Sequence, residues 1–162
     1  MEPSVYLEST IPSFIVGEIS PVLVTAARQI ATRRWWSRHR YDYRLFVSRL
    51  VQEEISRGDT DLAQERLTLV AGLPELVIDD VVLAFAKELR RELKWTAVPE
   101  QDAIHLAAAS HYYMDYLLTW NLTHIANAEV RRAIDRYSAR SGTYIATICT
   151  PDELLGGEEN DD

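Results

Sequence analysis

Cysteine is almost absent from the 162-residue sequence, which excludes several classes of site. The single thiol, Cys149, cannot form a disulfide within the chain. It lies in the apolar run "TYIATIC", where we expect a small buried residue in a protein of a reducing compartment. Neither a thiolate zinc site nor a catalytic cysteine is supported.

Long apolar runs and glycine-rich loops are also lacking. No stretch approaches the roughly 20 residues that a membrane-spanning helix needs. The N-terminus has no basic segment followed by an apolar one, so we expect no secretory signal and a cytoplasmic protein without membrane contact. None of the six glycines belongs to a phosphate-binding loop after a strand, which argues against a nucleotide-binding module of that type.

The chain is acidic overall, but one segment of it is basic. The net charge is −8, and the final segment 156–162, "GGEENDD", holds four acids and no base. We expect this segment to be an acidic disordered tail, and the rest of the chain carries a net charge of −4. Between residues 28 and 49 the sign reverses, with seven arginines against the single acid Asp42.

Apolar periodicity predicts strands that alternate with helices along residues 1–155. The expected strands are 4–8, 43–48, 74–78, 116–120 and 143–149. The expected helices are 19–40, 49–58, 60–70, 81–94, one that starts near Pro99, and 128–140, with a last turn at "PDELL". The helix after Pro99 is apolar nearly all round and should be central. This alternation predicts one α/β domain with a parallel sheet covered on both faces.

Four oxygen-bearing side chains stand where such a sheet places a ligand, outside the carboxyl ends of its strands. Glu8 follows "VYL" and Asn121 follows "LLTW". Asp102 lies in the first turn of the apolar helix, and Glu54 borders the buried stripe of helix 49–58. Three carboxylates and a carbonyl oxygen together suit a hard cation such as Mg²⁺ or Mn²⁺.

Each of these side chains also has an ordinary structural explanation. Glu8 would be a polar residue at a strand end, and Asp102 an acid that complements the helix dipole. Glu54 would be a solvated helix residue, and Asn121 a turn residue. Spacing alone leaves both interpretations open.

Four motifs carry a resemblance to a known family: "VYLEST", "LVQEEISRGD", "DAIHLAAA" and "DYLLTWNLTHIAN". In their order and context they resemble the PIN-domain superfamily, and within it the VapC-type toxins of toxin–antitoxin systems. The resemblance implies a three-layer α/β/α sandwich with a central, mainly parallel sheet. It also implies a metal-dependent endoribonuclease, often a homodimer, restrained by a cognate antitoxin protein.

The resemblance assigns catalytic positions to Glu8, Glu54, Asp102 and Asn121. Glu8, Asp102 and Asn121 would hold Mg²⁺ (or Mn²⁺), with Glu54 contributing directly or through water. The family usually has Asp at the position of Glu8 and an acid at that of Asn121. The extra methylene of Glu8 shifts its carboxylate, and Asn121 loses a charge that would help to hold a second cation.

Neighbouring polar residues have two readings as well. Thr10 and Thr119 resemble hydroxyls that support bound water or a carboxylate, although strand and turn packing would explain them equally. His105 lies in so apolar a helix that we expect a packed histidine. His111 and His124 have no spacing that suits zinc.

Arginines alternate with aromatic residues in "RRWWSRHRYDYR", residues 33–44. Such a stretch can hold RNA phosphates while an aromatic ring stacks on a base. It can also be a helix end with aromatics packed inward, or a surface for the antitoxin. Trp35 continues the apolar stripe and should be buried, whereas Trp36 should be freer to contact a partner.

Two functions follow from these patterns. The first is hydrolysis of single-stranded or loop RNA by metal-activated water. The second is a catalytically weak PIN module that binds RNA or a protein partner without cleavage, as Asn121 and the acidic net charge would favour.

Overall fold

The computed structural model describes residues 1–95 and 97–156, and its centre is a five-stranded sheet in the order β3-β2-β1-β4-β5. Every strand pair in it is parallel. The strands are β1 Ser4–Leu7, β2 Arg44–Ser48, β3 Glu75–Leu76, β4 Tyr116–Leu118 and β5 Thr147–Cys149. The predicted parallel sheet is therefore confirmed.

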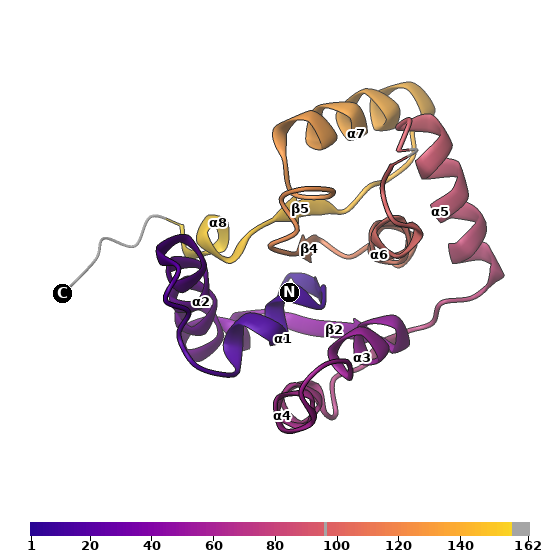
Figure 1. Cartoon of the computed structure of the whole chain (residues 1–162). Helices are drawn as coiled ribbons and strands as arrows, with labels where there is room; N and C mark the ends of the chain where they lie inside the picture. The colour runs from indigo at the N-terminus through magenta and orange to yellow at the C-terminus, as the bar shows by residue number, and fades with distance from the viewer. Residues whose placement is uncertain (96, 157–162) are drawn as a thin grey trace.

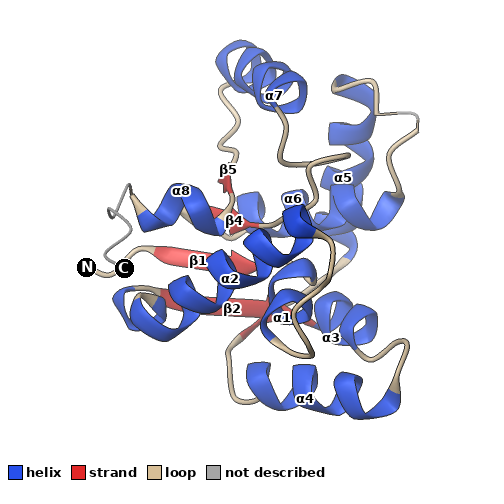
Figure 2. Ribbon diagram, turned by 60° about the vertical axis from the view of Figure 1, so that its left-hand side comes forward, coloured by secondary structure: helices blue, strands red, loops and turns tan. Residues whose placement is uncertain are grey.

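Helices cover both faces of this sheet (Figures 1 and 2). The helices α1, α2, α4 and α8 pack side by side on one face, and α5, α6 and α7 lie on the other. The short helix α3 follows β2 and packs against α4. This is the expected three-layer α/β/α sandwich. The bounds are α1 Thr10–Ile15, α2 Leu23–Arg38, η1 Arg40–Asp42, α3 Arg49–Ile55, α4 Thr60–Val70, α5 Asp80–Glu92, α6 Glu100–His111, α7 Ala128–Ser141 and α8 Pro151–Leu155.

Burial follows the sequence pattern closely. All four residues of β1 are buried, as expected for a strand covered on both faces. In α6 every residue from Asp102 to Ser110 is buried, so the predicted central helix is confirmed. Cys149 is also buried in the core, and burial raises the pKa of its thiol to about 12. That thiol is therefore an unreactive packing residue.

Several elements differ from the sequence prediction, and β3 and β4 are shorter than the predicted ranges 74–78 and 116–120. Helix α1 was not predicted, and its first turn is anchored by the burial of Ile11 and Pro12. Helix α2 begins at Leu23 rather than at residue 19, because the Ser20 hydroxyl and the Gln29 amide bind the backbone N–H groups of Val22 and Ser20. The last strand is three residues long instead of seven, since Ser110 Oγ accepts the N–H of Ala146 and withdraws it from the sheet.

The order of the strands creates a crevice between β1 and β4. The two strands are neighbours, with Leu7 opposite Leu118. The chain leaves β1 toward α1 on one face and leaves β4 toward α7 on the other. Ligands bind at such switch points, outside the carboxyl ends of the strands. The residues that follow Leu7 and Leu118 line this crevice.

Two further predictions concern the C-terminal tail and membrane-spanning helices. Of the expected acidic tail 156–162, only Gly156 belongs to the described part, and residues 157–162 lie outside it. Among the described residues, no helix is long and apolar enough to cross a bilayer.

At the opposite, amino ends of the strands, Asp115 ties β4 to β1. Asp115 Oδ2 accepts hydrogen bonds from the backbone N–H and the hydroxyl of Ser4, at 2.7 and 2.8 Å. The N–H of Asp115 donates to Ser4 Oγ at 3.0 Å. The bonds from Ser4, with a smaller contribution from Arg44, lower the pKa of the Asp115 carboxyl below its ordinary value of 3.8.

Replacement of Asp115 by Asn should therefore lower the stability in a pH-dependent way. Asn keeps the shape but loses the charge, and solvent screening limits the loss at neutral pH to about 0.5 kcal/mol. Because the folded-state pKa is depressed, this stabilisation is complete above pH 3.8 and is lost as the pH falls through the folded value. Urea denaturation at several pH values measures it. A difference between wild type and Asp115→Asn that persists undiminished in acid would contradict this account.

Candidate metal centre

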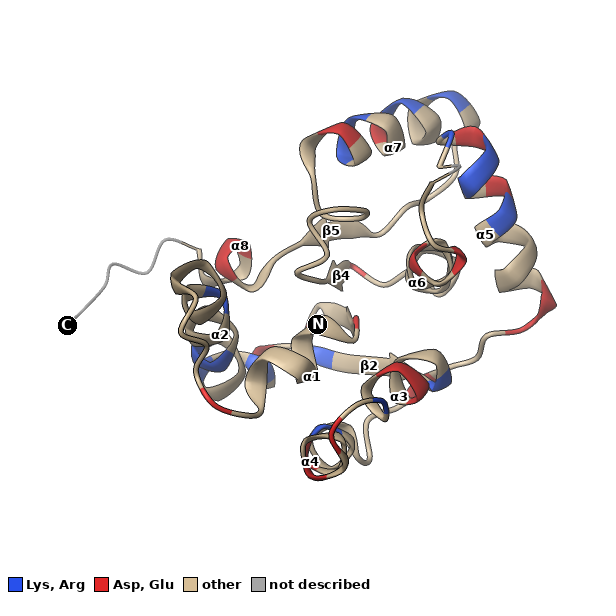
Figure 3. Ribbon diagram, viewed as in Figure 1, with Lys and Arg blue, Asp and Glu red and all other residues tan. Residues whose placement is uncertain are grey.

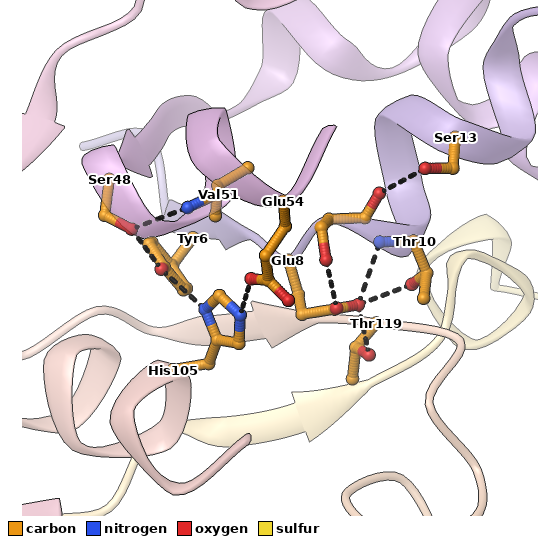
Figure 4. A network of polar contacts seen from close by, with 10 residues as sticks. Tyr6, Glu8, Thr10, Ser13, Ser48, Val51, Glu54, His105 and Thr119 are labelled. Carbon is orange, nitrogen blue, oxygen red and sulfur yellow. Dashed lines mark hydrogen bonds and ion pairs between the residues drawn. The ribbon is translucent and has the colours of Figure 1, made fainter. Parts of the chain in front are cut away.

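Glu8 is a buried carboxylate at the carboxyl end of β1. Its N–H donates to the carbonyl of Leu118 at 3.1 Å, and the residue is only 3% exposed. Oε1 accepts the hydroxyl of Ser9 at 2.7 Å. Oε2 accepts the N–H and the hydroxyl of Thr10, at 3.1 and 2.5 Å, and the hydroxyl of Thr119 at 2.8 Å (Figure 4). Four donors thus stabilise a negative charge at this end of the sheet.

The two threonine hydroxyls join the ends of β1 and β4 through Glu8. While each donates to Glu8, the hydroxyl of Thr10 accepts the N–H of Trp120 at 2.8 Å and that of Thr119 accepts the N–H of Asn121 at 2.9 Å. These bonds agree with the explanation in which the two threonine hydroxyls support a carboxylate. The position of Glu8 therefore depends on both loops of the crevice.

Glu54 reaches the same crevice from α3 and binds His105 of α6. Its Oε1 lies 2.5 Å from His105 Nε2, and its side chain is 21% exposed, whereas the His105 side chain is fully buried. The other ring nitrogen, Nδ1, lies 2.8 Å from the hydroxyl of Tyr6, which in turn lies 2.7 Å from Ser48 Oγ. Ser48 caps α3 by accepting the N–H of Val51. A continuous chain of hydrogen bonds thus joins the start of α3 to Glu54, and Figure 4 shows it beside Glu8.

The charges around His105 favour its protonated form. Burial alone lowers the pKa of this imidazole, but the hydrogen bond with Glu54 and the negative charges of Glu8, Glu54 and Asp102 outweigh it, so the pKa is raised. Burial raises the pKa of Tyr6, opposed by its bond with Ser48 and reinforced by Glu8 and Glu54, so this hydroxyl stays protonated. Three carboxylates therefore create a field that attracts positive charge to one point.

Glu8, Glu54 and His105 are close enough to share one cation. Each offers a ligand atom, and these three atoms lie within 4.8 Å of one another. Ligands about 2.1 Å from a Mg²⁺ ion lie at most about 4.2 Å apart, so small side-chain movements would complete such a site. The two carboxylates suit Mn²⁺ as well as Mg²⁺, and the imidazole would be a ligand only in its deprotonated form.

Asp102 lies beside this group with partners of its own. It is 8% exposed in the first turn of α6, and its Oδ2 lies 2.8 Å from His124 Nδ1. Burial raises the pKa of this carboxyl, while hydrogen bonds with Asn121 and His124 oppose the shift. Among the described residues, Asp102 is outside the set within 4.8 Å, although its charge acts on His105.

Asn121 uses its carbonyl oxygen in a turn. Its Oδ1 accepts the N–H of His124 at 3.0 Å, and its side chain also opposes the rise in the pKa of the Asp102 carboxyl. In this structure the side-chain oxygen of Asn121 therefore stabilises a turn, which agrees with the explanation of Asn121 as a turn residue. The residue lies at the expected place, the loop after β4, next to the predicted ligand Asp102.

Sequence reasoning missed both histidines of the centre. His105 is buried, as expected, but both of its ring nitrogens have polar partners. Its position three residues after Asp102 puts both side chains on one face of α6, and that spacing was the available signal. For His124, the only signal was its place three residues after Asn121. The side-chain oxygen of an Asn often accepts the backbone N–H of a residue at such a spacing. Glu53, by contrast, faces solvent and pairs with Arg49.

The basic stretch does not gather at this centre. Helix α2, which carries most of its arginines (Figure 3), returns the chain from the carboxyl ends to the amino ends of the strands. Near the acids, the guanidinium of Arg28 lies 5.6 Å from the ring centroid of Trp120. Arg40 and Arg44 lie at the amino ends instead. Trp35 is fully buried, as predicted, and Trp36 is partly buried.

Comparison with known proteins finds similarity in structure alone. No family model and no curated protein matches the chain. VapBC2 from Rickettsia felis, solved bound to a DNA fragment from its promoter, matches with a TM-score of 0.54 at 14% identity, over 90% of this chain and 97% of that one. FitAcB from Neisseria gonorrhoeae matches with a TM-score of 0.56 at 12% identity, over 93% of this chain and 99% of that one.

The chain has the PIN-domain fold. The resemblance drawn from the sequence motifs is confirmed at this level, and over nearly the whole chain. The PIN-like fold also accounts for the site, because it brings the end of β1, the helix α3 and the start of α6 to one crevice.

Replacement of Thr119 by Val tests the bridge between β1 and β4. Val has nearly the same shape but no hydroxyl, so the N–H of Asn121 and one oxygen of Glu8 lose a buried partner. The free energy of unfolding should fall by about 1–3 kcal/mol. Thr119→Ser is the matched control, since it keeps the hydroxyl and should cost only about 0.8 kcal/mol for the lost methyl group. Equal losses in urea denaturation would show that the hydroxyl does not hold the crevice together.

Proposed function

We propose that this protein is a metal-dependent endoribonuclease, the toxin of a toxin–antitoxin pair. The observation that carries the proposal is the meeting of Glu8, Glu54 and His105 within 4.8 Å at the switch point of a PIN-like fold. The expected acids of α3 and β1 thus lie side by side although they are far apart in sequence. The similarity in fold to VapBC2 and FitAcB supports the same class of function.

The donor set fits a hard divalent cation. Glu8 and Glu54 would hold Mg²⁺ or Mn²⁺. Asp102 and Asn121 would join them on releasing His124, to which both are bound. When bound, such a cation lowers the pKa of a water molecule and neutralises charge on the phosphodiester. Thr10 and Thr119 fix the orientation of Glu8 for this purpose.

His105 has a positioning role in this proposal. Its Nε2 holds the Glu54 carboxylate in the crevice, and its Nδ1 is held in turn by Tyr6. When protonated, the imidazole would also place a positive charge beside the three carboxylates. Arg28, beside Trp120 at the same end of the sheet, offers a cation for a phosphate of single-stranded or loop RNA.

Protein partners would bind the exposed apolar side chains around the start of α2. Leu23 is 83% exposed, and Val22 and Val24 are each 59% exposed. Apolar side chains gathered in this way mark interaction surfaces in soluble proteins. A cognate antitoxin protein and a second copy of the chain in a homodimer are the partners that we propose for this molecule.

One observation favours a second candidate, a catalytically weak PIN module that binds RNA or a protein partner without cleavage. The side chain of Asn121 brings no charge, and its oxygen is already bound to the N–H of His124. Cleavage assays distinguish the two candidates through Asn121→Asp. A weak module should gain at least about tenfold in rate from the added carboxylate, whereas an enzyme whose cation is held by the three acids should change little.

Replacement of Glu54 by Gln tests the assigned site directly. Gln keeps the size of the side chain but removes the charge, and the initial rate of RNA cleavage with Mn²⁺ or Mg²⁺ should fall by about 100-fold or more. Glu53→Gln is the matched control, because Glu53 precedes it in α3 and faces solvent. Chelation of the metal by EDTA should abolish cleavage by wild type and by Glu53→Gln. Equal rates for the two variants would show that Glu54 has no part in the reaction.

A further inference from the structure

A pocket lies at the other end of the sheet from the metal centre, and residues of the basic, aromatic stretch line much of it. Its volume is about 660 Å³, within the range of small-molecule sites. Aromatic rings and two guanidinium groups predominate in its lining, over an apolar floor. The lining includes Glu2, Trp36, Arg40, Tyr41, Arg44 and Phe46.

This pocket is separate from the metal centre. Arg44 begins β2 and lies opposite Ser4 at the start of β1, whereas Glu8 follows the end of β1. The four residue-to-residue steps from Ser4 to Glu8 correspond to about 13 Å along an extended strand. RNA held only at the metal centre would therefore leave this pocket uncovered.

Stacking holds the guanidinium of Arg40 in place. Its central carbon lies 5.0 Å from the ring centroid of Trp36 and 4.4 Å from that of Tyr41, and one of its nitrogens donates to the Tyr41 hydroxyl. A guanidinium that is stacked on its faces keeps its N–H edge for oxygen acceptors. Arg40 is therefore oriented in advance to bind an anion.

Arg44 supplies the second cation of the pocket. Its guanidinium lies 5.9 Å from the ring centroid of Phe46, and its Nε donates to the backbone carbonyl of Glu2 at 3.3 Å. Within residues 1–95 and 97–156, no carboxylate forms a salt bridge with either arginine. Glu2 lines the same pocket, so the lining carries a net charge of +1.

The geometry points to a nucleotide-binding pocket: we propose that it takes a nucleoside monophosphate unit, either free or within a single strand. Arg40 and Arg44 would bind the phosphate, since guanidinium N–H groups match phosphate oxygens in charge and geometry. The base would stack on the partly buried ring of Trp36 or on Tyr41, which is 72% exposed. The proposal does not depend on RNA cleavage, because no residue of the metal centre lines the pocket.

The test is to titrate the protein, in the presence of EDTA, with uridine monophosphate, adenosine monophosphate or a short single-stranded RNA. Tryptophan fluorescence and calorimetry measure the binding. We expect saturable binding with quenching of Trp36, and a loss of about tenfold in affinity for each of Arg40→Ala, Arg44→Glu and Trp36→Ala. Arg132→Ala, an exposed site on α7, is the charge-matched control and should bind as wild type does. Trp36→Phe keeps a stacking ring and should retain most of the affinity, which guards against a loss through misfolding.

The remaining outcomes decide the source of the ligand and the proposal itself. Binding of the free monophosphates supports a free nucleotide, and binding of the RNA alone supports a nucleotide within a strand. Absence of saturable binding up to about 10 mM, where binding would contribute only a few kcal/mol, overturns the proposal. Binding that survives both Arg40→Ala and Arg44→Glu also overturns it. Binding that Glu8→Gln abolishes overturns it as well, since the nucleotide would then lie at the metal centre.

Discussion

The burial of the Glu8 carboxylate between two strand ends is the constraint on which the rest of the site depends. Only 3% of the residue is exposed, so the charge must be compensated inside the protein. The compensation comes from Ser9, Thr10 and Thr119, and the two threonines also bind backbone N–H groups of the loop after β4. One side chain therefore fixes both loops at the switch point, and the parallel pairing of β1 with β4 determines where the crevice opens.

The second half of the centre follows from the same electrostatic logic. Glu54 and Asp102 bring two more acids to the crevice, and unpaired acids would repel one another there. His105 and His124 reduce that repulsion, the first by binding Glu54 and the second by binding Asp102. A divalent cation would replace part of this role, because its positive charge would also reduce the repulsion among the acids. The pocket around Trp36 and Arg40 is lined by two arginines and one acid, Glu2, and its net positive charge favours an anion instead.

Much of the fold was predictable because its signals are local. The strand before Glu8, the apolar helix that contains Asp102 and the alternation of strands with helices each depend on short apolar patterns. Helix α1 was missed because six residues with a proline carry no clear period, and tertiary burial stabilises it instead. The shortened β5 depends on a bond from Ala146 to Ser110, which lies 36 positions away.

The candidate site divides in the same way between local and distant effects. Glu8 and Asn121 were located from strand ends, and Glu54 from its position beside a buried stripe. The pairing of Glu54 with His105, 51 positions apart, needed the three-dimensional structure. The same is true of the arginines between residues 28 and 49, because Arg28 of α2 lies beside Trp120 whereas Arg40 of η1 lies beside Trp36.

The central claim is that Glu8 and Glu54 bind a divalent cation together. Anomalous diffraction from crystals soaked in Mn²⁺ measures this most directly, since the manganese signal locates the ion without assumptions about activity. The account predicts a peak bonded to carboxylate oxygens of both Glu8 and Glu54, with the Glu54–His105 contact lengthened. A crystal in saturating Mn²⁺ that shows no peak in this crevice, with the Glu54–His105 bond intact, would contradict it.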